Sequence, residues 1–371
     1  MARDGKGMTQ PTHGGNVYKV AREQRIPVDR IMDFSASINP LGPPAAGLRA
    51  IRSALKQIVH YPDPDCWQLR KELAQQCGVD PDMILVGNGS TELIHLLPRA
   101  LAIKSALIMG PTFDEYSRAL MNAGSSVLYV QARREEDFRP PLKEVLRQFS
   151  AKRSKFDSVF LCNPNNPTGQ VMNRLAVREL AEDVDRKQGW LIVDEAFIDY
   201  CQTQSVVSML STHPRMMVLR SLTKFYAMPG LRIGYLVGAS KVVDQLKDRQ
   251  PPWSVNSLAQ EVSRAVLHDH AYATKSRAFM KSERSRFIRG LRSVSGVRVF
   301  PSTANFVLIE LPASTCAGEV TDRLACERLL VRDCSTLPGL TTQMIRVAIR
   351  TAKENQRLIG VLGVCLRKRQ S

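Results

Sequence analysis

Short apolar segments alternate with longer amphipathic segments through the middle of this 371-residue chain. The alternation predicts strands separated by helices, and strands of this kind form mainly parallel sheets that helices cover on both faces. The predicted strands are Met83–Val86, Ala106–Met109, Val127–Val130, Val159–Cys162, Leu191–Val193, Met217–Leu219 and Ile233–Val237. We therefore expect an α/β fold.

The two ends of the chain follow other patterns. Residues 1–45 are rich in proline and glycine, and a long helical region to about Arg292 follows the break at Pro251–Pro252. Further elements are expected at Ile31–Phe34, Ala45–Ile58, Val297–Phe300, Phe306–Glu310, Ala317–Glu327, Leu330–Arg332 and Met344–Ile349. Because the chain exceeds one typical core, we predict a large domain (46–252) and a small C-terminal domain (253–371). The N-terminal residues are expected to form an arm that packs on the small domain.

The first candidate for chemistry is Lys224, in the run S-L-T-K-F-Y-A-M-P-G-L-R-I-G-Y. Ser221 and Thr223 precede it, and Arg232 follows eight positions later. Lysine is the only side chain that forms a stable, exchangeable Schiff base, while hydroxyl and guanidinium groups suit a phosphate. The spacing fits a lysine that condenses with an aldehyde cofactor carrying a phosphate. A lysine near an arginine is by itself more typical of a solvated surface, so this interpretation depends on the rest of the chain.

Three further segments strengthen the interpretation. In M-I-L-V-G-N-G-S-T-E-L-I, a strand and a glycine-rich turn lead into a helix that begins at Ser90 or Thr91, and free amides there bind anions. In F-L-C-N-P-N-N-P-T-G-Q, a strand ends in a loop that turn chemistry alone also explains. In W-L-I-V-D-E-A-F-I-D-Y, Asp194 ends a strand, where its carboxylate can keep a pyridine nitrogen protonated. Together with Lys224, these segments predict a site for pyridoxal phosphate (PLP).

These segments follow one another in the same order as in the type I PLP enzymes, which the chain resembles. Those enzymes have the aspartate aminotransferase fold, with a large domain built on a mainly parallel sheet and a smaller α/β C-terminal domain. The resemblance implies that Lys224 forms the Schiff base, Asp194 pairs with the pyridine nitrogen, and Asn166 binds the phenolic oxygen. It implies that Phe113, in P-T-F-D-E-Y, stacks on the cofactor ring. It also implies a set of residues that hold the phosphate: Gly89, Ser90, Ser221, Thr223 and Arg232, with Tyr61 contributed by the second subunit of a homodimer.

Four motifs narrow the resemblance to the threonine-phosphate decarboxylases of cobalamin biosynthesis. They are H-G-G-N (13–16), D-F-S-A-S-I-N-P-L-G-P-P (33–44), Y-P-D-P (61–64) and D-E-A-F-I-D-Y (194–200). Histidinol-phosphate aminotransferases share the fold and most of the cofactor contacts. The resemblance implies decarboxylation of O-phospho-L-threonine to (R)-1-amino-2-propanol phosphate, with transamination as the alternative. The residues that it implies at the substrate are His13, Gly14, Ser37, Asn166, Arg332 for the phosphate and Arg346 for the α-carboxylate.

Two positions depart from the patterns of these families. Phe197 occupies the place where the aminotransferases usually have a tyrosine that bonds the phenolic oxygen, and this favours the decarboxylases. Ser37 stands where the decarboxylase pattern more often has asparagine, so its side chain is shorter there.

Composition is that of a soluble enzyme. Hydrophobic residues make up 44% of the chain, no apolar run is long enough to span a membrane, and the N-terminus lacks the apolar core of a signal peptide. The eight cysteines form no C-x-x-C pair, which favours reduced thiols in a cytoplasmic protein. His268 and His270 are two apart in a helical region and point to different faces, so we expect no metal site.

The net charge of +17, from 52 basic and 35 acidic residues, raises the question of nucleic-acid binding. The basic residues are scattered along helical stretches such as Lys275–Arg292, with few aromatic residues among them. A regulator with this fold would need an N-terminal winged helix, and no room for one exists before residue 13. A positive field would also attract a phosphorylated substrate. We therefore expect a small phospho-amino acid as the partner, and neither nucleic acid nor a membrane.

Overall fold

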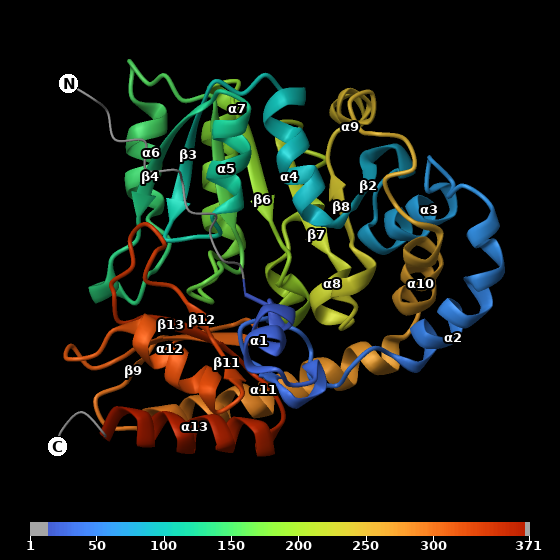
Figure 1. Cartoon of the computed structure of the whole chain (residues 1–371). Helices are drawn as coiled ribbons and strands as arrows, with labels where there is room; N and C mark the ends of the chain where they lie inside the picture. Colours follow the sequence, from blue (N-terminus) through green and yellow to red (C-terminus); the bar gives the residue numbers. More distant parts are fainter. Residues whose placement is uncertain (1–13, 368–371) are drawn as a thin grey trace, which may run out of the picture.

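The larger of two main sheets has seven strands within residues 14–367, the part of the chain that the computed structural model describes (Figure 1). In spatial order they are β2 (Ile84–Asn88), β8 (Ile233–Val237), β7 (Met216–Ser221), β6 (Trp190–Asp194), β5 (Ser158–Cys162), β3 (Ser105–Gly110) and β4 (Ser126–Gln131). All neighbouring pairs are parallel except those of β8, which runs antiparallel to β2 and β7. The predicted α/β fold with a mainly parallel sheet is confirmed.

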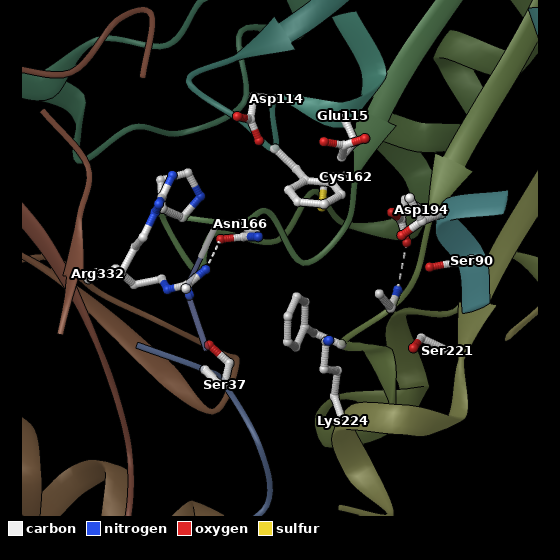
Figure 2. Close-up of a pocket in the computed structure, with 18 of the residues that line it drawn as sticks. Ser37, Ser90, Asp114, Glu115, Cys162, Asn166, Asp194, Ser221, Lys224 and Arg332 are labelled. Carbon is white, nitrogen blue, oxygen red and sulfur yellow. Dashed lines mark hydrogen bonds between the residues drawn. The ribbon is translucent and has the colours of Figure 1, made fainter. Parts of the chain in front are cut away.

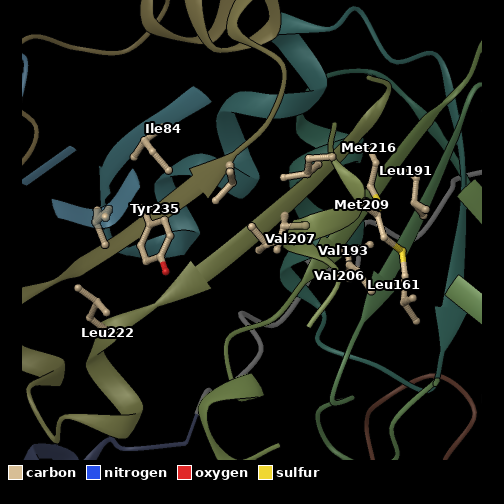
Figure 3. Packing of buried hydrophobic residues seen from close by; sticks show 14 of the residues in the cluster. Ile84, Leu161, Leu191, Val193, Val206, Val207, Met209, Met216, Leu222 and Tyr235 are labelled. Carbon is tan, nitrogen blue, oxygen red and sulfur yellow. The ribbon is translucent and has the colours of Figure 1, made fainter. Parts of the chain in front are cut away.

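Helices cover both faces of this sheet because successive side chains of each strand point to opposite sides. Phe160 of β5 packs on one face, and its neighbour Leu161 packs on the other. The first face carries α4 (Gly89–Ala100), α5 (Glu115–Asn122) and α9 (Ser240–Lys247). The second carries α3 (Trp67–Cys77), α6 (Leu142–Ser150), α7 (Arg174–Arg186) and α10 (Ser257–Leu267). Figure 3 shows part of the second core, where Val207 and Met209 pack with Leu161 and Val193.

The C-terminal part of the chain builds a smaller antiparallel sheet with its own core. Its strands, in order, are β12 (Arg332–Asp333), β13 (Met344–Ala348), β10 (Phe306–Glu310) and β9 (Arg298–Val299). The helices α11 (His270–Arg292), α12 (Ala317–Cys326) and α13 (Ala352–Arg367) pack on it. Figure 1 shows this sheet below the carboxyl ends of the larger sheet's parallel strands.

Residues 14–33 lie against the layer that contains the smaller sheet, while an arm over residues 1–45 stays a prediction. Helix α1 (Val17–Gln24) is tied there by Gln24, whose Nε2 donates to the carbonyl oxygen of Ala325 over 2.7 Å. Strand β1 (Met32–Asp33) pairs in parallel with β11 (Leu329–Leu330). Helix α2 (Ala45–Ala54) follows.

Short 3₁₀ helices occur at several connections along the chain: η1 (Val28–Arg30), η2 (Leu55–Val59), η3 (Pro81–Met83), η4 (Arg134–Glu136), η5 (Ile198–Tyr200), η6 (Gln202–Gln204), η7 (Val207–Met209) and η8 (Pro229–Leu231).

The long helical region predicted after Pro252 is divided. Asp269 separates α10 from α11, and its Oδ1 accepts a hydrogen bond from the backbone N–H of Tyr272 over 2.9 Å. An aspartate in this role satisfies a free amide of the first helical turn, so a new helix begins there. Helix α10 packs with the larger sheet and α11 reaches both cores. The division into domains at residue 252 stays a prediction.

Membrane-spanning helices and clustered metal ligands are both absent from residues 14–367. No helix in this range is long and apolar enough to cross a membrane, and no group of three or more histidine, cysteine or acidic side chains is arranged to hold a metal ion. None of the eight cysteines forms a disulfide; two of them, Cys316 and Cys326, are exposed, while the others are buried or half-buried.

Candidate active site

Most of the residues predicted to hold the cofactor lie at or just after the carboxyl ends of β2, β3, β5, β6 and β7, which run in the same direction, and Arg232 directly precedes β8. Because such ends meet at one edge of a sheet, residues far apart in the sequence come together there. They line a cavity of about 460 Å³ between the two sheets (Figure 2). Of the predicted site residues, the cavity is lined by Gly14, Ser37, Gly89, Ser90, Phe113, Asn166, Asp194, Ser221, Thr223, Lys224, Arg232, Arg332 and Arg346.

Lys224 lies on α8 (Leu222–Phe225), the short helix that begins directly after β7. Burial, together with the positive charges of Arg232 and Arg346, lowers the pKa of its amine to about 8, although Asp194 opposes the shift. An amine with a pKa near 8 is neutral in a substantial fraction of molecules at neutral pH, whereas an ordinary lysine is almost fully protonated. The neutral form is the nucleophile that condensation with an aldehyde requires.

Asp194, the last residue of β6, is buried and held by two hydrogen bonds. Its Oδ2 accepts from the hydroxyl of Tyr116 over 2.7 Å, and its Oδ1 accepts from the backbone N–H of Ala196 over 2.9 Å. Burial raises the pKa of this carboxyl, while the two donors and Lys224 favour its ionised form. A buried carboxylate fixed in this way can pair with a cation in the cavity, such as a protonated pyridine nitrogen.

Tyr116 is the functional residue that the sequence analysis missed. Its side chain is buried, and its ring contacts that of Phe113 edge-on, with 5.7 Å between the ring centroids. Its run, P-T-F-D-E-Y, was singled out for Phe113, which precedes α5, while Tyr116 lies in the first turn of that helix. What no pattern showed was that Tyr116 meets the end of β6.

An anion-binding cup lies at the N-terminus of α4. Gly89 has φ of +75°, and a Cβ atom there would stand 2.4 Å from Nη2 of Arg232, so the guanidinium lies directly on the glycine. The hydroxyls of Ser221 and Thr223 are 2.8 Å apart at the same place. Free amides at a helix start, two hydroxyls and a guanidinium form a set that suits a phosphate group.

Two arginines of the smaller sheet face the cavity from the other side. Arg332 of β12 and Arg346 of β13 are direct partners across the antiparallel pair, and both are buried. Like charges directly opposite each other destabilise a sheet. Within residues 14–367, no acidic side chain forms an ion pair with either guanidinium. Burial lowers the pKa of Arg346 to about 10, and its Nε is buried without a hydrogen-bond partner in the described part. The pair is therefore arranged for anionic groups of a ligand.

Asn166 joins the two sides of the cavity. Its Oδ1 accepts a hydrogen bond from Nη1 of Arg346. Figure 2 shows its amide nitrogen at the opposite end, away from the arginine. An amide nitrogen with its oxygen already engaged can donate to an oxygen of a bound cofactor.

The comparisons with known proteins agree with this geometry. A model of the family described as aminotransferase class I and II matches residues 29–362. The chain belongs to this family. It is 38% identical over 355 residues to a threonine-phosphate decarboxylase from Salmonella typhimurium, a match that covers 94% of this chain and 95% of the relative. The predicted resemblance is confirmed.

Two further matches bear on the reaction. A bifunctional protein of adenosylcobalamin biosynthesis from Leptospira interrogans is 31% identical over 353 residues, which cover 95% of this chain and 41% of that protein. The crystal structure of histidinol-phosphate aminotransferase from Clostridium acetobutylicum has a TM-score of 0.84 at 30% identity, covering 90% of this chain and 99% of that one.

Enzymes of the class I and II aminotransferase family use PLP, and this chain is a PLP enzyme. The described residues fit the cofactor. The cavity offers a lysine of lowered pKa, a buried carboxylate, an amide donor and an anion cup in which a Cβ atom at position 89 would meet the guanidinium of Arg232. Each of these corresponds to one polar part of PLP: the aldehyde, the pyridine nitrogen, the phenolic oxygen and the phosphate.

Four residues singled out in the sequence require separate mention. Ser37 lines the cavity with a buried hydroxyl that has no partner in the described part, and Phe197 packs edge-on against Phe306, with 4.9 Å between ring centroids. Tyr61 does not line the cavity of its own chain: its side chain is 80% exposed and stacks on Trp253. His13 lies outside the described residues.

Proposed function

We propose that this enzyme decarboxylates O-phospho-L-threonine, releasing CO₂ and forming (R)-1-amino-2-propanol phosphate for cobalamin biosynthesis. The observation that carries the proposal is the pair of buried arginines, Arg332 and Arg346, opposite Lys224 in one cavity. Two guanidiniums that have no acidic partner among residues 14–367 suit a substrate with two anionic groups. The matches to a threonine-phosphate decarboxylase and to a protein of adenosylcobalamin biosynthesis support the same substrate and pathway.

In this proposal the chain's residues choose which bond breaks. PLP, when bound, accepts the electron pair released by cleavage of a bond to the α-carbon. Arg346 binds the α-carboxylate and Arg332 the phosphate, so together they fix the orientation of the three bonds at that carbon. Asp194 holds the positive charge of the pyridine nitrogen. After CO₂ leaves, a proton must reach the α-carbon, and Lys224, with a pKa of about 8, can carry it at neutral pH.

Transamination of an amino-alcohol phosphate is the second candidate, favoured by the likeness to histidinol-phosphate aminotransferase. Its substrate also carries a phosphate, so the two arginines do not separate the reactions. Phe197 favours decarboxylation, because the aminotransferases usually place a tyrosine hydroxyl at that position.

Turnover of O-phospho-L-threonine without any keto acid separates the two reactions. A decarboxylase returns its cofactor to the starting form in every cycle, so we expect repeated turnover and stoichiometric CO₂ release. A transaminase would stop after one equivalent per site and would resume when 2-oxoglutarate is added. That second result would overturn the proposed reaction while leaving the PLP site intact.

We also propose that the enzyme is a homodimer in which each chain completes its partner's cofactor site with Tyr61. Trp253 stacks on this residue and is exposed, and three further exposed apolar side chains lie close to it in the sequence: Ile58, Val59 and Trp67. Large apolar side chains that gather on a surface are typical of protein interfaces. Tyr61 is not among the residues that line the cavity of its own chain, so a role at the phosphate requires a second copy.

Mixing two inactive variants tests the shared site. Tyr61→Ala and Lys224→Ala homodimers each lack one part in both sites. A hybrid dimer holds one site with Lys224 from one chain and Tyr61 from the other, so we expect activity to return to a substantial fraction of the wild-type value per site. Because a Tyr61 that served its own chain would leave no hybrid site complete, absence of recovery in hybrids verified by sedimentation and mass analysis would contradict the shared site.

A further inference from the structure

Ser35 lies where three parts of the cavity meet. It is buried, it lines the cavity, and its backbone carbonyl accepts a hydrogen bond from Nη2 of Arg346 over 2.6 Å. Its hydroxyl donates to Oδ1 of Asp33 over 2.6 Å and lies 2.7 Å from the backbone N–H of Gly15. One residue thus touches Arg346, the end of β1 and the N-terminal segment.

The direction of these hydrogen bonds is fixed by chemistry. A carboxylate only accepts, so the single hydroxyl proton of Ser35 goes to Asp33. The hydroxyl oxygen is then left as an acceptor for the N–H of Gly15. Asp33 is held in place in turn, because its Oδ1 also accepts from the backbone N–H groups of Ser35 and Ala36, over 2.7 and 3.2 Å. The acceptor that meets Gly15 is therefore well oriented.

Within residues 14–367, the N-terminal segment has few other attachments. We call residues 14–24 the strap. Its helix α1 buries none of its side chains, and the bond from Gln24 to Ala325 holds only its far end. At the near end, Gly14 lies directly on Ser35: a Cβ atom at Gly14 would stand 2.3 Å from the carbonyl oxygen of Ser35. Gly14 itself lines the cavity, so the position of the strap decides how the cavity is bounded on this side.

We propose that Ser35 is a positioning residue that latches the strap against the cavity beside Arg346. The latch keeps Gly14 and Gly15 next to the turn that contains Ser35, whose carbonyl oxygen orients Arg346. A substrate bound by Arg346 therefore lies beside a strap that is held in place. The catalytic consequence rests on the proposed function. The latch itself, as a contact between Ser35 and Gly15, does not.

Hydrogen exchange of the ligand-free protein tests the latch. Ser35→Ala removes the acceptor of the Gly15 amide, and a hydrogen bond of ordinary strength corresponds to roughly a fivefold change in opening. We expect exchange in a peptide covering the strap to accelerate about that much. Exchange in β13, which lies in the core of the smaller sheet, serves as the internal reference. Ser37→Ala is the matched variant, because it removes a buried hydroxyl from the same loop that has no partner in the described part.

The exchange results have three possible readings. Acceleration confined to the strap in Ser35→Ala, and absent in Ser37→Ala, supports the latch. Equal acceleration in the strap and in β13 would show a general loss of stability and would overturn it, as would unchanged exchange in the strap. None of these readings depends on which reaction the enzyme catalyses.

Kinetics then test the positioning role. We expect Ser35→Ala to raise KM for O-phospho-L-threonine about fivefold and to change kcat by less than about twofold, because the strap bounds the cavity without touching the reacting bond. If the strap of Ser35→Ala exchanges faster while its KM stays at the wild-type value, Ser35 does not position the substrate. Absence of decarboxylation in the wild-type enzyme would instead contradict the proposed function and leave the exchange result standing.

Discussion

Lys224→Ala is expected to lower turnover by on the order of a thousandfold or more while the chain keeps its fold. The lysine is the only amine that lines the cavity among the described residues, and its pKa of about 8 suits both covalent attachment of the cofactor and transfer of a proton. No other lysine side chain in that part of the chain reaches the same place. We also expect loss of the visible absorbance that accompanies a lysine-bound cofactor.

Lys275→Ala is the matched control, because Lys275 is exposed on α11, away from the cavity. It removes the same side chain and the same charge, and turnover and absorbance should stay at wild-type values. Circular dichroism and a thermal melt of both variants show whether the fold is kept. Full activity of a folded Lys224→Ala protein would contradict the assignment of the whole site.

The sequence predicted the strands and the cofactor loops well because both depend on local patterns. Apolar runs such as Val159–Cys162 are fully buried strands, and the glycine before Ser90 marks the turn that leads into α4. Lys224 was identifiable because hydroxyls and an arginine accompany it within a few positions. Chemistry that is compact in the sequence could be recognised without a structure.

Relations that depend on tertiary pairing could not be predicted in the same way. The run Ile233–Val237 is apolar on both faces, so nothing in it indicates that β8 runs antiparallel to its neighbours. The contact of Tyr116 with Asp194 and that of Ser35 with Gly15 join segments 78 and 20 positions apart. The sequence also placed Arg332 and Arg346 separately, and only the register of β12 and β13 makes them neighbours.

The pairing of Arg332 with Arg346 predicts a second large effect on substrate binding. Arg332→Ala and Arg346→Ala should each weaken substrate binding, but with different selectivity. A buried, charge-assisted contact contributes roughly 1.5–3 kcal/mol, which corresponds to a loss of about 10- to 100-fold in apparent affinity. We expect Arg332→Ala to lose this factor for O-phospho-L-threonine and almost nothing for L-threonine. Arg346→Ala should lose it for both ligands, since both carry the α-carboxylate.

Titration of each variant with the two ligands, followed by the cofactor's absorbance or by calorimetry, measures the four affinities. Arg332→Lys and Arg346→Lys are the matched controls: they keep the charge and lose the bidentate geometry, so they should fall between the wild type and the alanine variants. Because the two guanidiniums are adjacent, removal of one also relieves the repulsion on the other, which partly offsets the loss. Selectivity between the ligands is therefore the decisive quantity. Equal losses for both ligands in both variants would contradict the assignment of one arginine to each anionic group.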